Sequence, residues 1–435
     1  MDKAKQKAVD WLDAHAKDVS GLLSDMIAIP SVNPWFGGDK ALQREGDVQR
    51  FLAKKMRALG ADIDMFEPDP KALAKYKGRP GYYEDRDFTD RPNMAATVKG
   101  TGGGRSLMLA GHIDVVPPGE GWTVKPFSGE VRDGVLFGRG AVDMKGGVAA
   151  MIMGLEAVLA SGLRPKGDVM VATVVEEESG GMGSLAFVDR GYRADAGIMT
   201  ESTGMTVAPL CRGILWGRLK IKGRSGHIEL PQGDWRTGGA VDAIAKARLM
   251  LRQFDLMNQD WALWRTHPLM TLPCQILAAQ FDAGEYPTAF ANSATIAFNA
   301  QYLPRERDEN KLGGSIKKMI EDHIRKAADL DPWLALNPPE IEWLVDADCA
   351  EVPSDHPFVG CMTRALADSG VEPRLEGIGF HTDMGWYVNT GTAMVNFGPG
   401  DPRLAHQPDE RLPVDELLRC AKTVAGAIVD WCGAE

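Results

Sequence analysis

Four short apolar runs, each followed at once by a glycine or an acidic residue, constrain the fold of this chain more than any other feature. They cover residues 107–110, 169–175, 196–200 and 393–397. Each run is continuous rather than alternating, which is typical of strands buried on both faces of a parallel sheet. Helical stretches lie between them, notably 146–161 and 181–190. The alternation predicts an α/β fold with crossover connections and a mostly parallel central sheet.

The segment from 207 to 330 has a different pattern from the rest of the chain. Strand-like and helical stretches alternate in it, at 214–222, 239–254, 294–303 and 311–328. This order is typical of an α+β domain inserted into a larger one. A last helical stretch, 413–431, returns the chain to the first domain. We therefore predict a discontinuous domain of residues 1–206 and 331–435, and an inserted domain of residues 207–330.

The net charge and the cysteine pattern argue against several kinds of partner and site. The 435 residues include 49 Lys and Arg against 60 Asp and Glu, which gives a formal net charge of −11. Nucleic acids and anionic membranes bind basic faces, so we expect neither as a partner. No apolar run approaches the roughly 20 residues of a membrane-spanning helix, and no apolar signal core begins the chain. The 6 cysteines are scattered singly, which argues against a thiolate metal site and favours a cytoplasmic location.

Ligand-type side chains follow the apolar runs, where an open α/β sheet binds its ligands. They are His112, Asp114, Glu177, Glu178, Glu201 and His406, and Asp143 joins them from just before a helical stretch. Each of them alone is more often a helix cap, a turn residue or a solvated side chain. Packing does not require acids at the ends of different strands, however, and facing buried carboxylates are destabilising without a cation. A histidine and carboxylate set without cysteine suits one or two Zn²⁺ ions, or Co²⁺ or Mn²⁺.

Six motifs in order resemble a known family of metallohydrolases. They are Gly-His-Ile-Asp-Val-Val-Pro from 111, Gly-Arg-Gly-Ala-Val-Asp-Met-Lys-Gly-Gly from 138, Glu-Glu-Glu-Ser-Gly-Gly from 176, Thr-Glu-Ser-Thr from 200, His-Thr-Asp from 381, and Phe-Gly-Pro-Gly from 397 with His-Gln-Pro-Asp-Glu from 406. The family is that of dinuclear zinc hydrolases and exopeptidases such as acetylornithine deacetylase, succinyl-diaminopimelate desuccinylase, aminoacylase and carboxypeptidase G. The segment Arg91-Pro92-Asn93-Met94 is most similar to the acetylornithine deacetylase-like branch. The resemblance implies that the inserted domain, 207–330, is a dimerisation (lid) domain.

The resemblance also implies a set of metal ligands for two divalent ions per chain, with Zn²⁺ expected before Co²⁺ or Mn²⁺. Asp143 would bridge the two ions. His112 and Glu201 would complete the first site, and Glu178 and His406 the second. A cis peptide bond after Asp143 is a further expectation from the family.

Three other residues receive roles from the same resemblance. Glu177 would be the general base, and Asp114 would orient the imidazole of His112. His227 of the inserted domain would reach the active site of the other subunit of a homodimer. The Ser-Gly-Gly that follows the three glutamates places Glu176 outside the site, and we expect it to be solvated or to start a helix.

The substrate is less well determined, because the chain departs from the family at Gln301, where the family commonly has an arginine that holds the substrate carboxylate. Glutamine cannot supply that charge. Either the small-molecule substrate lacks the carboxylate, or another arginine such as Arg212 replaces the missing one. We expect Gln301, Arg212 and Thr382 to contact the substrate.

Three functions remain open at this point. The first is an acetylornithine deacetylase-like amidohydrolase, which cleaves an amide C–N bond with metal-activated water and acts on an N-acyl amino acid or an unusual aromatic amide or amine. The second is a dipeptidase or carboxypeptidase on the same scaffold. The third is a catalytically silent, metal-binding dimer, which a complete ligand set with an intact Glu177 disfavours.

Overall fold

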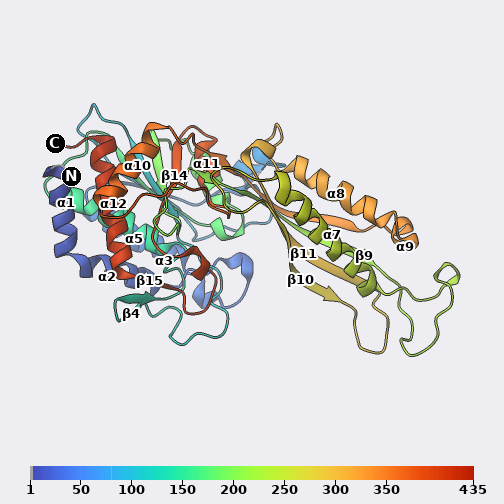
Figure 1. Ribbon diagram of the computed structural model, residues 1–435. Helices are drawn as coiled ribbons and strands as arrows, with labels where there is room; N and C mark the ends of the chain where they lie inside the picture. Colours follow the sequence, from blue (N-terminus) through green and yellow to red (C-terminus); the bar gives the residue numbers. More distant parts are fainter. Residues whose placement is uncertain (1–2, 80) are drawn as a thin grey trace. The chain divides into compact units, whose positions relative to one another are not determined.

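The computed structural model describes residues 3–79 and 81–435. The chain forms two compact units (Figure 1). Unit 1 comprises Met1–Cys211, Ala350–Ile378 and Thr382–Glu435, and unit 2 comprises Arg212–Cys349 and Gly379–His381. No helix in the described ranges is long and apolar enough to cross a membrane.

A six-stranded sheet forms the centre of unit 1. Its strands, in spatial order, are β1 (Asp62–Phe66), β2 (Asn93–Val98), β6 (Val169–Val174), β3 (Leu107–His112), β7 (Ala196–Met199) and β14 (Ala393–Asn396). The four strands from β6 to β14 are parallel, and they are the four apolar runs of the sequence. Strands β1 and β2 add an antiparallel edge. The predicted mostly parallel sheet is therefore confirmed.

The helices of unit 1 pack against this sheet and against one another. They are α1 (Lys3–Ala14), α2 (Ala16–Ile27), α3 (Glu45–Ala58), α4 (Pro70–Leu73), α5 (Lys145–Ala160), α6 (Met182–Asp189), α10 (Pro357–Asp368), α11 (Met384–Val388) and α12 (Val414–Cys432). Small sheets join β15 (Arg411–Pro413), β5 (Val135–Phe137) and β4 (Glu130–Arg132), and β13 (Ala350–Glu351) with β8 (Leu210–Cys211).

Helix α5 is almost completely buried, which explains its apolar sequence on all sides. It packs against β3, α1, α2 and α12. Gly147 in its first turn is required by close approach, because a Cβ atom there would lie 1.7 Å from the backbone oxygen of Thr200. The start of α5, which follows Asp143, is thereby held against the end of β7.

Unit 2 is an antiparallel sheet with helices, as predicted for the insert. The sheet has the order β10 (Ile276–Ala283), β11 (Ser293–Tyr302), β9 (Gly213–Lys222) and β12 (Glu340–Ala347). Helix α7 (Ala243–Trp264) packs on β9, β10 and β11, α8 (Gly314–Ala328) lies beside α7, and α9 (Pro332–Leu336) follows. Buried and exposed residues alternate along β9 and β11, so one side of each strand packs into the hydrophobic core of unit 2.

The predicted limits of the insert, 207 and 330, need correction. Strand β12 lies beyond residue 330 and pairs with β9 along its whole length, so the unit continues to Cys349. It begins at Arg212, because the two-residue strand β8 pairs with β13 of unit 1. The short return Gly379–His381 also belongs to unit 2.

Candidate metal centre

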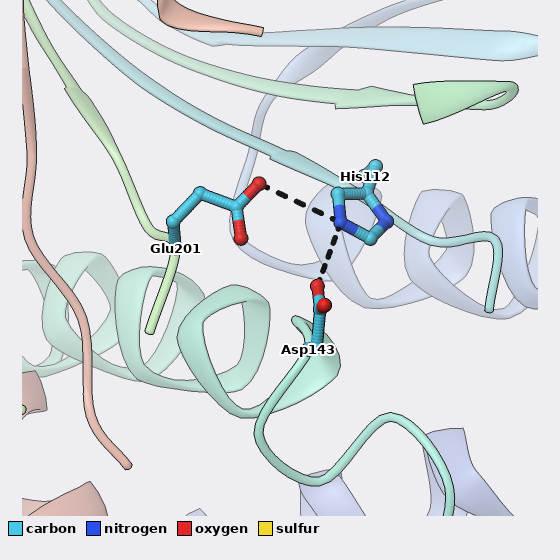
Figure 2. Close-up of side chains that lie close together, drawn as sticks. All are labelled: His112, Asp143 and Glu201. Atoms are coloured by element: carbon cyan, nitrogen blue, oxygen red, sulfur yellow. Dashed lines mark hydrogen bonds and ion pairs between the residues drawn. The ribbon is translucent and has the colours of Figure 1, made fainter. Parts of the chain in front are cut away.

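The carboxyl ends of β3 and β7 and the loop before α5 bring a histidine and two carboxylates together (Figure 2). His112 ends β3, and Glu201 lies two residues past β7, its parallel neighbour. The Nε2 atom of His112 lies 3.1 Å from Oδ1 of Asp143 and 3.6 Å from Oε1 of Glu201. One potential ligand atom from each residue lies within 4.8 Å of the others. Parallel strands end at the same edge of a sheet, so the sequence pattern predicts that His112 and Glu201 lie close together.

A second group shares Asp143 with the first. The Nε2 atom of His406 lies 3.2 Å from Oδ2 of Asp143 and 3.2 Å from Oε2 of Glu178. The two carboxylate oxygens of Asp143 thus face different histidines, as a carboxylate that bridges two cations does. The His406 side chain is 53% exposed, whereas that of His112 is 1% exposed. The second group therefore opens to solvent and the first is enclosed.

The charges around these groups fit a bound cation. Burial raises the pKa of Glu201 well above its usual value, and nearby carboxylates raise it further. Burial lowers the pKa of His112, but Glu201 and Asp143 raise it overall, and Glu178 raises the pKa of His406 to about 11. The raised pKa values of Glu201 and the two histidines favour bound protons, which a divalent cation would displace. The Oε1 atom of Glu178 is also buried without a hydrogen-bond partner among the described residues.

Glu177 lies beside both groups but belongs to neither. It begins a short 3-10 turn after β6, Glu177–Ser179, and its Oε2 atom lies 3.8 Å from Nε2 of His112. Burial raises the pKa of its carboxyl well above the usual value. Glu177 and Glu178 thus have different neighbours, since Glu177 lies beside His112 and Glu178 beside His406. The peptide bond after Asp143 is cis, as expected.

Asp114 contacts His112 mainly through its main chain. Its carbonyl oxygen lies 2.9 Å from Nδ1 of His112, while its carboxylate lies at 3.6 Å. If Nδ1 carries the proton and donates it to this carbonyl, the lone pair of Nε2 faces the carboxylates and can bind a cation. The Asp114 carboxylate accepts hydrogen bonds from the backbone N–H groups of Glu177 and Glu178, and from Nδ2 of Asn33. Asp114 therefore supports both the imidazole and the turn that carries the glutamates.

Glu176 directly precedes the 3-10 turn Glu177–Ser179, as one of its two predicted roles requires, but the other prediction, that it is solvated, is wrong. Its side chain is fully buried and forms ion pairs with Arg86 and Arg91, the second of which also binds Glu45. Its φ is +71°, a left-handed conformation that is uncommon outside glycine. Two guanidinium groups compensate for burying the charge. Nothing in the local sequence pairs these residues, because Arg86 and Arg91 lie in a polar segment that reads as a surface loop.

Gln301 and Arg212 lie together in unit 2. The Oε1 atom of Gln301 accepts a hydrogen bond of 2.7 Å from Nη1 of Arg212. The Nη2 atom of Arg212 donates to the carbonyl of Leu272, and the side chain is 2% exposed. Burial lowers the pKa of this guanidinium. Both terminal nitrogens of Arg212 therefore already donate hydrogen bonds within the protein.

The two remaining predicted residues lie in different surroundings. Thr382 is fully buried, and its hydroxyl donates a hydrogen bond of 2.9 Å to Oδ1 of Asn396. His227 of unit 2 is exposed and forms a β-bridge with Ala289. No role was predicted for Asp383 of the His-Thr-Asp motif, a buried carboxylate of unit 1 that accepts hydrogen bonds from Ser184 and Trp386.

Comparison with known proteins agrees with this geometry. The sequence model of a family described as peptidase family M20/M25/M40 matches residues 108–430. The chain is 26% identical to the N-formyl-4-amino-5-aminomethyl-2-methylpyrimidine deformylase of Halalkalibacterium halodurans, over 97% of this chain and 96% of that protein. It is 29% identical to the succinyl-diaminopimelate desuccinylase of Methylorubrum extorquens, over 94% of this chain and 97% of that protein. The di-peptidase Dug1p of Saccharomyces cerevisiae has the same fold, with a TM-score of 0.77, 16% identity and 99% of each chain covered.

Proposed function

Because the chain belongs to peptidase family M20/M25/M40, we propose that it hydrolyses the amide C–N bond of a small molecule with metal-activated water. One observation carries the proposal: Asp143 is shared by two ligand groups, with the carboxylate of Glu177 beside them. Five side chains would hold two divalent ions, with Zn²⁺ expected first and Co²⁺ or Mn²⁺ as alternatives. They are His112, Asp143, Glu178, Glu201 and His406.

The residues of the chain divide the chemistry between them. Two ions in this site would polarise the scissile carbonyl and lower the pKa of the attacking water. Glu177 accepts the proton of that water and then delivers it to the leaving nitrogen. Burial raises the pKa of its carboxyl well above the usual value, which favours the protonated form that the second step needs. Asp114 keeps the glutamate turn in place through the amide groups of Glu177 and Glu178.

We further propose a neutral, formylated or similarly acylated aromatic amine as the substrate. Gln301 carries no charge, and its neighbour Arg212 is buried and engaged by Gln301 and Leu272. This arrangement disfavours the bidentate binding of a substrate carboxylate. The similarity to the pyrimidine deformylase over nearly the whole chain supports the same choice.

A substrate panel tests this proposal. We expect N-formyl-4-amino-5-aminomethyl-2-methylpyrimidine to be cleaved with a kcat/KM at least about tenfold above those of N-acetylornithine, N-succinyl-diaminopimelate and dipeptides. Gln301→Arg should improve turnover of the carboxylates, and Arg325→Ala, at an exposed arginine of α8 in the same unit, is the control. Efficient dipeptide cleavage would instead favour the peptidase alternative. Efficient turnover of N-acetylornithine that is lost in Arg212→Ala would overturn the proposal.

We also propose that the chain is a homodimer joined through unit 2, within the range 207–330 first expected. Three leucines seven residues apart on α7, Leu249, Leu256 and Leu263, are exposed on the side away from the core. Strand β10 is an exposed sheet edge of eight residues. Monomeric proteins usually cover such exposed apolar side chains and such unpaired sheet edges.

Sedimentation and subunit mixing test the dimer. We expect the wild type to sediment as a dimer, and Leu256→Glu with Leu263→Glu to sediment as a monomer. Leu330→Glu, at an exposed leucine of unit 2 outside this face, should stay dimeric. His227→Ala and Glu177→Ala, each nearly inactive, should regain activity when their subunits are exchanged, because one site then holds both groups. Heterodimers without any such rescue would contradict a role of His227 across the interface.

A further inference from the structure

Unit 1 contains a buried ion pair that belongs to neither ligand group. Arg139 and Glu410 are 1% and 0% exposed, and Oε2 of Glu410 lies 2.5 Å from Nη1 of Arg139. Both charges are therefore removed from water, at a cost that the pair alone does not necessarily offset. Their other contacts show where the remaining hydrogen bonds are made.

Glu410 binds the backbone of the loop that carries Asp143. Its Oε1 atom accepts three N–H groups, at 3.1, 2.8 and 3.0 Å, from Gly140, Val142 and Asp143. Its own carbonyl oxygen accepts the N–H of Gly138 at 2.9 Å. One residue thus accepts hydrogen bonds from four backbone N–H groups of the segment 138–143. The same residue lies four positions after His406, so the two loops are tied together at Glu410.

Arg139 extends these contacts to a third loop. Its Nη2 atom donates to the carbonyl groups of Pro117 and Pro118 at 3.3 and 3.2 Å, in the loop that follows His112 and Asp114. Its Nη1 atom also lies 3.3 Å from the carbonyl of Gln407, beside His406. The guanidinium therefore contacts the segments after two different histidines of the ligand groups.

We propose that Arg139 and Glu410 are positioning residues that fix the spacing between Asp143 and His406, and thereby the affinity of the second ligand group for its divalent ion. The inference rests on the proposed metal-dependent function. Asp143 and His406 lie on loops, and irregular segments keep a fixed geometry only when other contacts hold them. Partners of this kind that orient ligands typically change metal affinity tenfold to a hundredfold when they are replaced.

Calorimetric titration of metal-free protein with Zn²⁺ tests the inference. Glu410→Gln keeps the shape of the side chain but loses the charge that faces Arg139 and the three amide groups. We expect it to bind the ion beside His406 at least about tenfold more weakly than the wild type does. Asp430→Asn removes one of the two carboxylates that pair with the largely buried Lys5, near the end of α12 opposite to Glu410. This control should bind both ions with unchanged affinity.

A second variant and the wild type make the outcome decisive. Arg139→Lys keeps the charge but loses the planar fork that reaches Gln407, Pro117 and Pro118, and it should also weaken the second ion. If both variants fold, by circular dichroism, and bind two ions with wild-type affinity, the positioning role is wrong while the proposed function stands. If the wild type binds fewer than two ions, the proposed function fails, and this inference fails with it. Equal weakening in Asp430→Asn would identify a general loss of stability and also overturn the inference.

Discussion

Glu177→Gln is expected to lower turnover by at least about a hundredfold, the scale of general-base catalysis, while both divalent ions stay bound. Glutamine has nearly the same shape but cannot accept the proton of the attacking water. The side chain belongs to neither ligand group that shares Asp143 and lies 3.8 Å from His112, so its replacement should leave the ligands in place. Steady-state kinetics together with metal analysis of the same preparation measure both quantities.

The neighbouring glutamate provides the contrast. Glu178→Gln should weaken one ion, because Oε2 of Glu178 lies 3.2 Å from Nε2 of His406. Glu130→Gln, at an exposed glutamate of β4, is the control and should change neither quantity. If the Glu177 variant stays active and the Glu178 variant keeps both ions tightly, the assignment of base and ligand is shifted by one residue.

Removal of metal is expected to abolish activity. The purified protein should contain close to two divalent ions per chain, and a strong chelator followed by desalting should remove both. Added Zn²⁺ should restore turnover, because the buried carboxylates and imidazoles of both groups would exchange their protons for the cations. Elemental analysis before and after chelation gives the stoichiometry.

The shared carboxylate makes this expectation more specific. Asp143→Asn should weaken both ions, whereas Glu201→Gln should weaken only the ion beside His112. Full turnover by demonstrably metal-free protein would refute metal-activated hydrolysis. Two independent ions that both survive the loss of Asp143 would contradict a bridging role for it.

The sequence by itself determined the central sheet and the place of the site. Continuous apolar runs have few alternatives to strands buried on both faces, and parallel strands end at one edge. His112 and Glu201 therefore had to meet once their strands became neighbours, as β3 and β7 are. The order of the motifs likewise identified the family, because residue types and spacing are properties of the chain alone.

Only the tertiary structure decided how the charges beside the site are neutralised. Glu176 is buried because Arg86 and Arg91 reach it, and Glu410 because Arg139, 271 positions earlier, lies beside it. The hydrogen bond between Gln301 and Arg212 also joins residues distant in sequence. Local patterns predict which segments are apolar or helical, but they do not encode which distant cation meets a given carboxylate.

The extent of unit 2 was decided in the same way. Strand β12 belongs to it because of its pairing with β9, more than a hundred residues earlier in the chain, and no periodicity in the sequence marks that pairing. A strand can be predicted from its own residues. The sheet that it joins depends instead on which neighbouring strand has unpaired backbone N–H and C=O groups. Leaving buried backbone groups or charges without partners costs free energy, and whether partners are present depends on the folded surroundings. The buried ion pairs and the pairing of β12 with β9 therefore emerged only from the three-dimensional structure.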